Sequence, residues 1–380
     1  MKPTVLLIGL GSLGSVILEL LVREPALGQI IVGSRNAARG EARCNLARLG
    51  ALAQGYHPVI RFLALDLNQQ DAVSDTVKRE APDLILSTAT MQTWWWPDLL
   101  PPDQADLIKS AGFGVWLPVH LTLTLKLMKA LYAAGYKGLT LTAPFPDVVN
   151  CVLDRLGLAP TCGVGNLDEI VPKIRLLAAE RLHAPLETVE VLLVAHHALE
   201  PAAFGEAVAE VPPYFLRIEH DGRDVTEAIR AEELVLAPYS IPSGPATHFL
   251  TAGSAVRLVR ALLSNRESRL HAPAPNGLPG GYPVIASQEG VRPFSIPGLS
   301  LAQAMAINEQ SHRFDGIERI EADGTVVFRP EAVAVLQHAL GYGYDRLPPD
   351  QAEPMAMELM TRFDEFARQH GVELKQTYLF

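Results

Sequence analysis

The chain opens with the sequence TVLLIGLGSLG at residues 4–14, and this stretch decides the fold of the region that follows. Thr4–Gly9 is an almost continuous apolar run, which predicts a strand buried on both faces. Ser12–Arg23 then repeats its apolar residues at helical spacing, and Gln29–Gly33 is a second short apolar run. A strand, a helix and a second strand in this order predict a parallel βαβ unit.

The turn between the first strand and the helix reads GLGSLG at residues 9–14 and fits the spacing G-x-G-x-x-G. Gly9 permits the tight turn, Gly11 lets the backbone approach a diphosphate, and Gly14 allows the helix to pack closely on the strand. Ser12 and Leu13 lie at the start of the helix, whose free N–H groups and positive dipole end suit phosphate groups. We therefore predict dinucleotide binding at this turn; the alternative is a glycine-rich turn that holds no ligand.

The end of the second predicted strand discriminates between the two nicotinamide dinucleotides. An NAD site usually carries Asp or Glu there to accept a hydrogen bond from the ribose 2′-hydroxyl, whereas this chain has Ser34 and Arg35. Ser34 can donate to a 2′-phosphate, Arg35 can pair with it and stack on adenine, and Arg39 follows one helical turn later. These residues predict NADP rather than NAD, unless the arginines only solvate a helix face.

Two further strand ends carry candidate cofactor contacts. Asp66 follows the third predicted strand, where it is placed to accept from the adenine amino group or, alternatively, to cap the next helix. Ser87, Thr88 and Ala89 end the fourth predicted strand, where small side chains leave room for a diphosphate and a ribose.

The alternation of strands and helices continues to about residue 150. The further predicted strands are Val59–Leu65, Asp83–Ser87, Gly114–Val119 and Gly138–Thr142, and the intervening predicted helices are Asn36–Leu49, Gln69–Glu80, Gln104–Ala111 and Leu121–Ala134. Asn36 suits the N-cap of its helix, and Gly50 and Gly135 suit the positions just after two helices. The pattern predicts the α/β class, with a Rossmann-type doubly wound parallel sheet.

The regular alternation of strands and helices has ended by about Gly165. Shorter predicted strands and helices now alternate with long loops rich in proline and glycine, which predicts a second, α+β domain. We place the dinucleotide-binding Rossmann domain at residues 1–155, the second domain at 156–310, and C-terminal helices that pack back on the first domain at 311–380.

The amino-acid composition, net charge and cysteine spacing argue against several classes of protein. Hydrophobic residues make up 48% of the chain and charged residues 19%, which suits a sizeable core. The net charge of −10 argues against nucleic-acid and membrane partners. The three cysteines, Cys44, Cys151 and Cys162, lack C-x-x-C spacing, which is typical of reduced thiols and argues against a zinc site. We expect a cytoplasmic protein that binds a small-molecule substrate and holds no metal.

Several segments resemble the saccharopine dehydrogenase-like NADP-binding oxidoreductases. They are the glycine fingerprint, Ser34-Arg35, Leu65–Leu67, Asp83–Ser87 and Phe145–Asn150, the last of which is similar to a D-P-G-x-x-N helix start through Pro146 and Asn150. The segment Trp116–Pro118 departs from the family because it lacks the acid of a Y-x-D strand end. The resemblance covers about the first 155 residues.

The resemblance implies a Rossmann domain, a substrate and dimerisation domain, and C-terminal helices that return to the first. It also implies a homodimer and redox chemistry at the C–N bond of an amino or imino acid, which is a functional inference by analogy.

Histidines are the candidate acid–base groups because their pKa lies near neutrality. His120 ends the predicted fifth strand, which places it at the edge of the sheet where a nicotinamide would lie. His196 and His197 follow an apolar strand, and alternation along a strand would point them to opposite faces. Each could instead be a structural histidine: a helix cap, a core residue or a surface residue.

We therefore expect an NADP-dependent oxidoreductase that acts on an amine, imine or carbonyl of a small substrate. Two alternatives stay open: a non-catalytic NADP-binding regulator or scaffold, and an enzyme that uses its nicotinamide transiently for epimerisation or elimination. Neither the substrate nor the direction of the reaction follows from the sequence.

Overall fold

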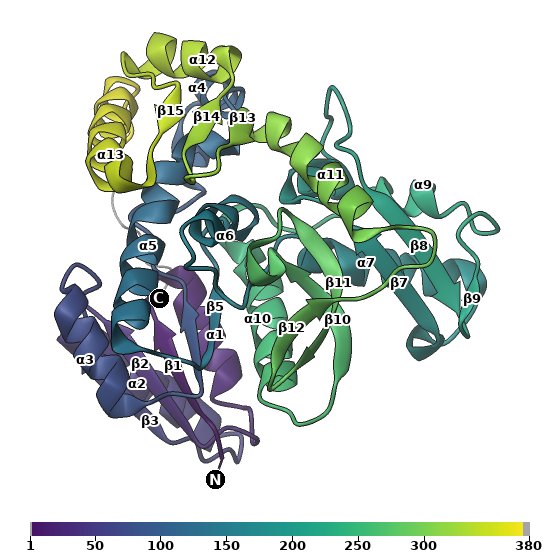
Figure 1. Ribbon diagram of the computed structural model, residues 1–380, viewed down its shortest axis with the longest axis horizontal. Coiled ribbons are helices and arrows are strands. Elements are labelled where there is room, and N and C mark those ends of the chain that lie inside the picture. The colour runs from purple at the N-terminus through teal and green to yellow at the C-terminus, as the bar shows by residue number, and fades with distance from the viewer. Residues whose placement is uncertain (1, 375–380) are drawn as a thin grey trace.

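The computed structural model describes residues 2–374, and its N-terminal lobe is built on a six-stranded parallel sheet with the order β3-β2-β1-β4-β5-β6 (Figure 1). The strands are β1 (Thr4–Ile8), β2 (Gln29–Ser34), β3 (Ile60–Ala64), β4 (Leu84–Ser87), β5 (Leu139–Thr142) and β6 (Cys162–Gly163). The helices are α1 (Ser12–Leu21), α2 (Ala37–Leu52), α3 (Gln70–Glu80), α4 (Pro102–Lys109), α5 (Leu117–Ala134) and α6 (Pro146–Arg155). The predicted Rossmann-type sheet is confirmed.

The central strand β1 is buried on both faces because its side chains alternate between two hydrophobic cores. Leu6 and Ile8 face a core shared with α3, α5 and the C-terminal helices. Val5 and Leu7 face a second core, shared with α1, α2 and a helix of the second lobe. The continuous apolar run at the start of the sequence thus serves two layers of helices at once.

The predicted fifth strand, Gly114–Val119, is wrong. Residues Phe113–Trp116 form the short 3-10 helix η2, which runs directly into α5. Pro118 lies in the first turn of α5, where proline is compatible with a helix. The apolar run reflects burial on every side, since Trp116 packs against a C-terminal helix, and β5 is instead the segment predicted as the sixth strand.

The helix after β2 also ends later than predicted. It continues through Gly50 to Leu52, so Gly50 is not the residue that follows the helix. The start is as predicted, because Asn36 accepts a hydrogen bond from the Arg39 amide at 3.0 Å. Gly135 ends α5 with a positive φ of 67°, as expected for a C-terminal glycine.

The rest of the chain adds three small antiparallel sheets, β7-β8-β9, β10-β11-β12 and β13-β14-β15. Their strands are β7 (Val189–Val194), β8 (Phe215–His220), β9 (Arg223–Asp224), β10 (Ser268–Pro273), β11 (Gly281–Ser287), β12 (Gly290–Pro293), β13 (Ile317–Ile320), β14 (Val326–Phe328) and β15 (Arg346–Leu347). The helices are α7 (Leu167–Leu182), α8 (Glu200–Ala203), α9 (Ala231–Val235), α10 (His248–Leu262), α11 (Leu301–Ser311), α12 (Pro330–Leu340) and α13 (Ala352–Gln369).

The C-terminal helices lie on the first lobe, and α10 of the second lobe packs on α1 (Figure 1). The α13 helix packs along α5, where the ring centroids of Phe363 and Trp116 are 4.9 Å apart. Lys126 and Glu353 form an ion pair of 2.6 Å between the same two helices. The domain boundaries at residues 155 and 310 stay a prediction.

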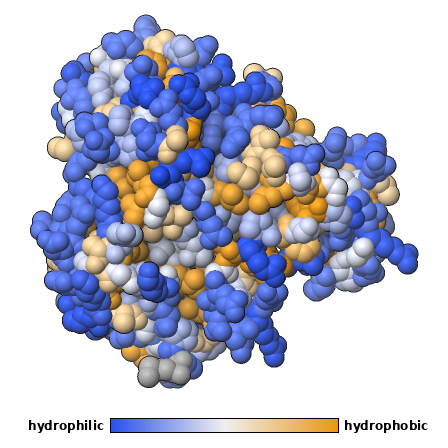
Figure 2. Space-filling view, in the orientation of Figure 1, coloured by the Kyte–Doolittle hydropathy of each residue, from blue (hydrophilic) through white to orange (hydrophobic). Residues whose placement is uncertain are grey.

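The surface shown in Figure 2 is hydrophilic over most of its outer rim, with apolar residues gathered in the middle of the face. Within residues 2–374, no single helix combines the length and apolar character needed to cross a membrane. One pair, Pro102–Lys109 with Phe113–Ala134, has the length and composition but is bent by 89° between its halves.

Candidate functional site

The order of the sheet reverses between β1 and β4, which run side by side although two strands separate them in sequence. In open α/β sheets, ligands bind outside the carboxyl ends of the strands at such a reversal. Ile8 lies opposite Ser87 in this pair, so Gly9 and Thr88 are the first residues beyond the edge. The glycine turn and the end of β4 therefore frame one crevice.

The three glycines of the turn have different surroundings. Gly9 has a φ of +95°, and a Cβ there would lie 2.7 Å from Thr88 Oγ1. A Cβ on Gly14 would collide with the carbonyl oxygen of Gly9, so helix and turn meet backbone to backbone. A Cβ on Gly11 would have no atom within 4 Å. Gly11 thus borders open space at the start of α1, which fits an approaching diphosphate.

The α1 helix begins at Ser12, with Gly11 as its N-cap. Ser12 and Leu13 lie in its first turn and are half-buried. The amides of a first helical turn have no partner within their own helix, which leaves them able to bind an anion. The residues of this turn fit a bound diphosphate.

The residues predicted to select NADP lie at the carboxyl ends of the neighbouring strands. Ser34 ends β2 and is half-buried, and Arg35 is exposed directly after it. Asp66 follows β3, and its Oδ1 accepts from the backbone amide and the side chain of Asn68, both at 3.0 Å. Asp66 does not cap α3, whose N-cap is Gln69, so the capping alternative is wrong.

The end of β4 is tied both to the glycine turn and to α5. Thr88 Oγ1 donates to the carbonyl of Gly9 at 3.2 Å. Ser87 is fully buried, and Ala89 is half-buried beside it. One residue further on, Thr90 Oγ1 lies 3.0 Å from His120 Nδ1.

His120 lies in the first turns of α5 and not at the end of a strand, because the predicted fifth strand is helical. It nevertheless faces the β4 edge, through its contact with Thr90. Its ring stacks on Phe113 with centroids 5.3 Å apart, and Phe113 and Phe145 meet edge to face at 4.8 Å. Phe145 in turn meets His197 edge to face at 5.1 Å. Two aromatic rings thus join His120 to His197.

His196 and His197 lie together rather than on opposite faces. The β7 strand ends at Val194, and His197 begins the short 3-10 helix η4 (His197–Leu199), so strand alternation no longer applies. The two rings are 4.6 Å apart, and the ring of His312 meets that of His196 at 5.4 Å.

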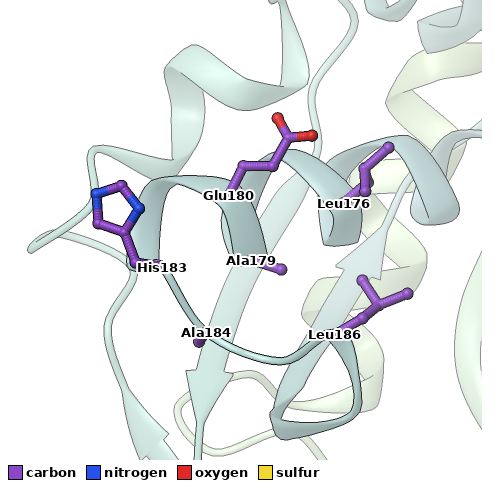
Figure 3. Close-up of a pocket in the computed structure, with 6 residues that line it drawn as sticks. All are labelled: Leu176, Ala179, Glu180, His183, Ala184 and Leu186. Carbon is purple, nitrogen blue, oxygen red and sulfur yellow. The ribbon is translucent and has the colours of Figure 1, made fainter.

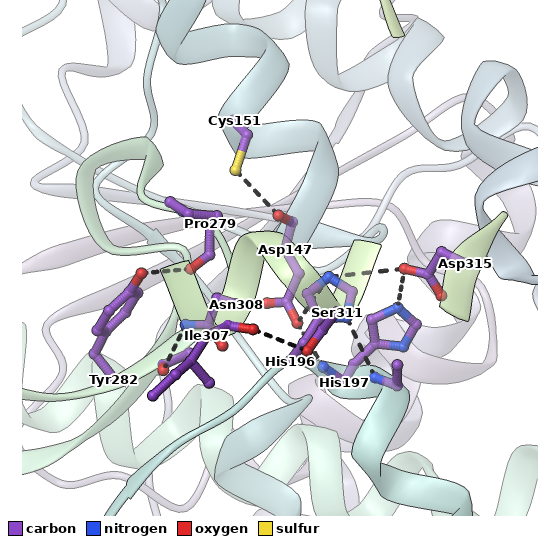
Figure 4. Close-up of polar contacts among 12 residues, drawn as sticks. Asp147, Cys151, His196, His197, Pro279, Tyr282, Ile307, Asn308, Ser311 and Asp315 are labelled. Carbon is purple, nitrogen blue, oxygen red and sulfur yellow. Dashed lines mark hydrogen bonds and ion pairs between the residues drawn. The ribbon is translucent and has the colours of Figure 1, made fainter. Parts of the chain in front are cut away.

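Two carboxyl groups complete this group of histidines (Figure 4). Asp315 Oδ2 lies 2.9 Å from His197 Nε2 and 3.7 Å from His196 Nε2. Asp147 Oδ2 accepts from the His197 amide at 2.8 Å and lies 4.0 Å from His196 Nε2. We call His196, His197, His312, Asp147 and Asp315 the histidine–carboxyl cluster.

The fold fixes both carboxyl groups by close backbone packing. Asp147 lies in the first turn of α6, where the helix dipole favours a negative charge. Asp315 ends the 3-10 helix η7 (His312–Asp315), which packs directly against η2. A Cβ on Gly114 would lie 2.5 Å from the Asp315 carbonyl oxygen, and one on Gly112 would collide with the Asp315 backbone. These two glycines let the Asp315 segment approach.

The charges of the cluster are shaped by opposing effects. Burial by itself would lower the pKa of His197, but the Asp315, Asp147 and Glu200 carboxyls raise it to about 9. Burial raises the pKa of Asp147 to about 6, although His197 acts in the opposite direction. Burial also raises the pKa of Glu200 well above its usual value. The groups that raise the pKa of His197 are thus three carboxyls, those of Asp315, Asp147 and Glu200.

The other histidines are held neutral. Burial, with His197 nearby, lowers the pKa of His120 to about 3 and that of His196 well below its usual value. Ala198 N donates to His196 Nδ1 at 3.3 Å, which in a neutral ring leaves the proton on Nε2. Within residues 2–374, His196 Nε2 and Asp147 Oδ1 are buried without a hydrogen-bond partner. Such atoms are rare in folded proteins and need an explanation.

The surface also has a hollow that lies apart from the candidate site. A hollow of about 470 Å³ is lined by Leu176, Ala179, Glu180, His183, Ala184 and Leu186, around the C-terminal end of α7 (Figure 3). The hollow is open, and its ionisable residues, Glu180 and His183, are exposed. The glycine turn and the cluster contribute no residue to it, so we do not include it in the candidate site.

The structure brings the predicted His120, His196 and His197 to one place, and His120 contacts the end of β4 through Thr90. The sequence reasoning missed Asp315, Asp147, Phe113 and Phe145. Asp147 lay inside the segment compared with a family motif, but no role was given to it. Nothing in the local sequence marks Asp315, which lies 118 residues beyond its partner His197.

No protein-family model matches the sequence, and no curated protein matches it. Solved structures do match. A minor L-lactate dehydrogenase from Enterococcus mundtii aligns at 19% identity with a TM-score of 0.55, over 82% of this chain and 96% of that one. Malate dehydrogenase from Cryptosporidium parvum aligns at 14% identity with a TM-score of 0.56, over 83% and 97%.

Lactate dehydrogenase from Eimeria maxima, solved with NADH and oxamate, aligns at 12% identity with a TM-score of 0.55, over 82% and 93%. None of these three structures is a saccharopine dehydrogenase, so the sequence resemblance is supported only as far as a Rossmann fold. The chain shares the fold of lactate and malate dehydrogenases across most of its length.

Proposed function

We propose that this chain is a nicotinamide-dinucleotide-dependent oxidoreductase of small molecules. The observation that carries the proposal is the placement of a glycine turn and a group of histidines at one edge of one sheet. The end of β4 joins them, because Thr88 contacts Gly9 and Thr90 contacts His120. A dinucleotide bound with its diphosphate at Gly11 would extend along this edge towards the histidines.

The proposed cofactor is NADP. The end of β2 offers Ser34 and Arg35 in place of the carboxylate that an NAD site usually carries. Arg35 is exposed and free to turn towards a 2′-phosphate, which a guanidinium binds well. The matched dehydrogenases solved with NADH make NAD the alternative to test against it.

The proposed reaction is hydride transfer between nicotinamide C4 and the carbon of a C=O or C=N group. In the reducing direction the hydride forms the new C–H bond, the π pair moves to the oxygen or nitrogen, and that atom then takes a proton. The names of the matched lactate and malate dehydrogenases support a carbonyl group. A C=N group is the second candidate, because the Asp315, Asp147 and Glu200 carboxyls around His197 suit a basic nitrogen.

We assign the proton transfer to His120 or to a water molecule that it orients. His120 is the histidine held by the β4 edge itself, through Thr90. Its ring is fixed against Phe113, so its position is set before a substrate arrives. Because burial lowers its pKa to about 3, His120 is neutral near pH 7, so it takes up a proton in the oxidising direction or orients the water that supplies one in the reducing direction.

The experiment is a two-step assay on the purified chain. Titration with NADPH and NADH, followed by nicotinamide fluorescence, measures cofactor binding. NADPH deuterated at C4 is then incubated with 2-oxo acids, neutral ketones and cyclic imines, and deuterium in the product reports hydride transfer. His120→Gln should lower kcat and leave the NADPH Kd unchanged, whereas His338→Gln, an exposed position on α12, should change neither.

Absence of binding to either nucleotide contradicts the proposal. Tight NADPH binding with no deuterium transfer across the panel contradicts the enzyme and supports a regulator or scaffold. Conversion of a substrate without net oxidation of NADPH would instead indicate a nicotinamide that is used transiently.

A further inference from the structure

We propose that His196, His197, Asp315 and Asp147 bind one divalent transition-metal ion beside the nicotinamide end of the crevice. The binding of the ion does not depend on the proposed function; only its use in hydride transfer does. No local sequence pattern marks this site, because the four donors come from three distant segments of the chain.

Three of the four donors already surround one point, and Asp147 lies beside them, next to His196. One nitrogen of His196, one nitrogen of His197 and one carboxylate oxygen of Asp315 all lie within 4.8 Å of one another. His196 Nε2 is 3.7 Å from Asp315 Oδ2 and 4.0 Å from Asp147 Oδ2. His197 Nε2 is 2.9 Å from Asp315 Oδ2. Figure 4 shows the two rings and both carboxyl groups converging.

Three buried atoms of the histidine–carboxyl cluster lack a hydrogen-bond partner among the described residues: His196 Nε2, His312 Nε2 and Asp147 Oδ1. In the described part of the chain, His196 Nε2 and Asp147 Oδ1 have no hydrogen bond, although both side chains are completely buried. A buried polar atom left without a partner costs about 1–3 kcal/mol. An ion bound to His196 Nε2 would satisfy that atom, and the Asp147 oxygen 4.0 Å from it is Oδ2, which also accepts from the His197 amide.

The spacing of the donors suits a single ion better than a water molecule. Metal–nitrogen and metal–oxygen bonds of about 2.0–2.2 Å in a tetrahedron place the donors about 3.3–3.6 Å apart. A water molecule with hydrogen bonds of about 2.8 Å needs its partners about 4.5 Å apart. The separations of His196 Nε2 from Asp315 Oδ2 and Asp147 Oδ2, 3.7 and 4.0 Å, lie between these values and closer to the first. The 2.9 Å between His197 Nε2 and Asp315 Oδ2 is a hydrogen bond.

The chemistry of the donors points to the class of metal. Two imidazole nitrogens and two carboxylate oxygens suit Zn²⁺ and the neighbouring divalent transition metals, whereas Mg²⁺ and Ca²⁺ prefer oxygen donors alone. Two carboxylates and two neutral imidazoles around a divalent ion carry no net charge. The ion therefore removes the electrostatic penalty of burying both Asp147 and Asp315.

The fold also supplies the groups that position the ligands. Asp147 Oδ2 accepts from the His197 amide at 2.8 Å, which fixes one ligand through the backbone of another. The ring of His312 packs edge to face on that of His196. Two contacts must change on binding. Nε2 of His196 becomes a ligand only when Nδ1 carries the proton, so the 3.3 Å bond from Ala198 N is given up. His197 Nε2 must release the proton of its 2.9 Å hydrogen bond to Asp315 Oδ2.

An ion at this point would lie one aromatic layer from His120, since Phe145 contacts both His120 and His197. With four protein ligands the ion would have no open position for a substrate oxygen or nitrogen, so its contribution to hydride transfer would be to fix the cluster residues beside His120.

The test uses the full chain without an affinity tag, stripped with a chelator and then loaded with Zn²⁺ or Co²⁺. We expect one ion per chain by elemental analysis, and visible absorption typical of four-coordinate Co²⁺ with nitrogen and oxygen ligands. Asp315→Asn and His196→Gln should each weaken Co²⁺ binding by about a hundredfold or more. His271→Gln, which changes a buried histidine outside the histidine–carboxyl cluster, should retain the absorption.

A wild-type chain that takes up no ion overturns the proposal, and this measurement needs no variant to fold. Co²⁺ binding that is unchanged in both ligand variants overturns it as well, because the ion would then be held elsewhere. NADPH titration of the metal-free chain separates the two proposals: cofactor binding without any metal uptake defeats this inference alone, and metal uptake without cofactor binding defeats the proposed function alone.

Discussion

Gly11 and Gly14 belong to one turn, yet the structure predicts opposite consequences for their substitution. A Cβ on Gly11 meets nothing within 4 Å, and the φ of −73° at Gly11 suits any residue. Gly11→Val should lower the free energy of unfolding by only about 1 kcal/mol, because valine is a poorer N-cap than glycine. A Cβ on Gly14 would collide with the Gly9 carbonyl oxygen and lie 2.9 Å from Thr88 Oγ1. Alanine there should cost about 2 kcal/mol, because the collision outweighs the gain in helix propensity.

The effects on cofactor binding should run the other way. Valine at Gly11 fills the space where a diphosphate would meet the first amides of α1. Losing two charge-assisted hydrogen bonds of about 1.5 kcal/mol each corresponds to a loss of about a hundredfold in NADPH affinity. Urea unfolding of wild type, Gly11→Val and Gly14→Ala gives the three free energies of unfolding. NADPH titration of the same proteins gives their dissociation constants. The reasoning is refuted if Gly11→Val binds NADPH as wild type does, or if Gly14→Ala is the more stable of the two variants.

Three further predictions test the cofactor preference, a buried histidine and the C-terminal packing. Arg35→Ala should weaken NADPH binding about 5- to 30-fold, the value of a partly solvated phosphate contact, and leave NADH binding unchanged; equal NADPH affinity in both proteins would remove NADP as the preferred cofactor. Burial lowers the pKa of His271 from 6.5 in the unfolded chain to about 3 in the folded one. Below pH 6.5 the unfolded chain therefore binds a proton at His271 that the folded chain does not bind. The free energy of unfolding is thus unaffected by this histidine above pH 6.5 and falls as the pH is lowered towards 3. By pH 5 the loss is about 2 kcal/mol, and urea unfolding at pH 7 and pH 5 should show a smaller loss in His271→Gln; identical losses would contradict the assignment. Phe363→Ala should cost about 3–5 kcal/mol because the ring is completely buried against Trp116, while Met357→Ala on the exposed face of the same helix should cost less than about 0.5 kcal/mol; similar costs would show that α13 does not pack on α5 as described.

The first βαβ unit was predictable because its signals are local. The apolar run at residues 4–8, the glycine spacing and the Asn36 cap each act within one or two turns of chain, and each has its predicted structure. The segment around Trp116 was not predictable in the same way. Its residues are apolar because they are buried on all sides. In a short run where every residue is apolar, the spacing of apolar and polar residues cannot distinguish a helix from a strand.

The candidate site was predictable only in part, for a related reason. His196 and His197 stood out because two titratable residues followed an apolar strand, but their shared location depends on the early end of β7 at Val194. Asp315 depends on tertiary packing alone, because its segment reaches the histidines only by lying against Gly112 and Gly114. Contacts between segments so far apart leave no mark in local sequence patterns.

A crystal structure of the chain with NADP bound would locate both ends of the cofactor. We predict the diphosphate against Gly11 and Ser12, with nicotinamide C4 facing the space between His120 and His197. A nicotinamide ring bound on another face of the molecule, or a crevice at the end of β4 that stays empty at saturating NADP, would contradict this prediction.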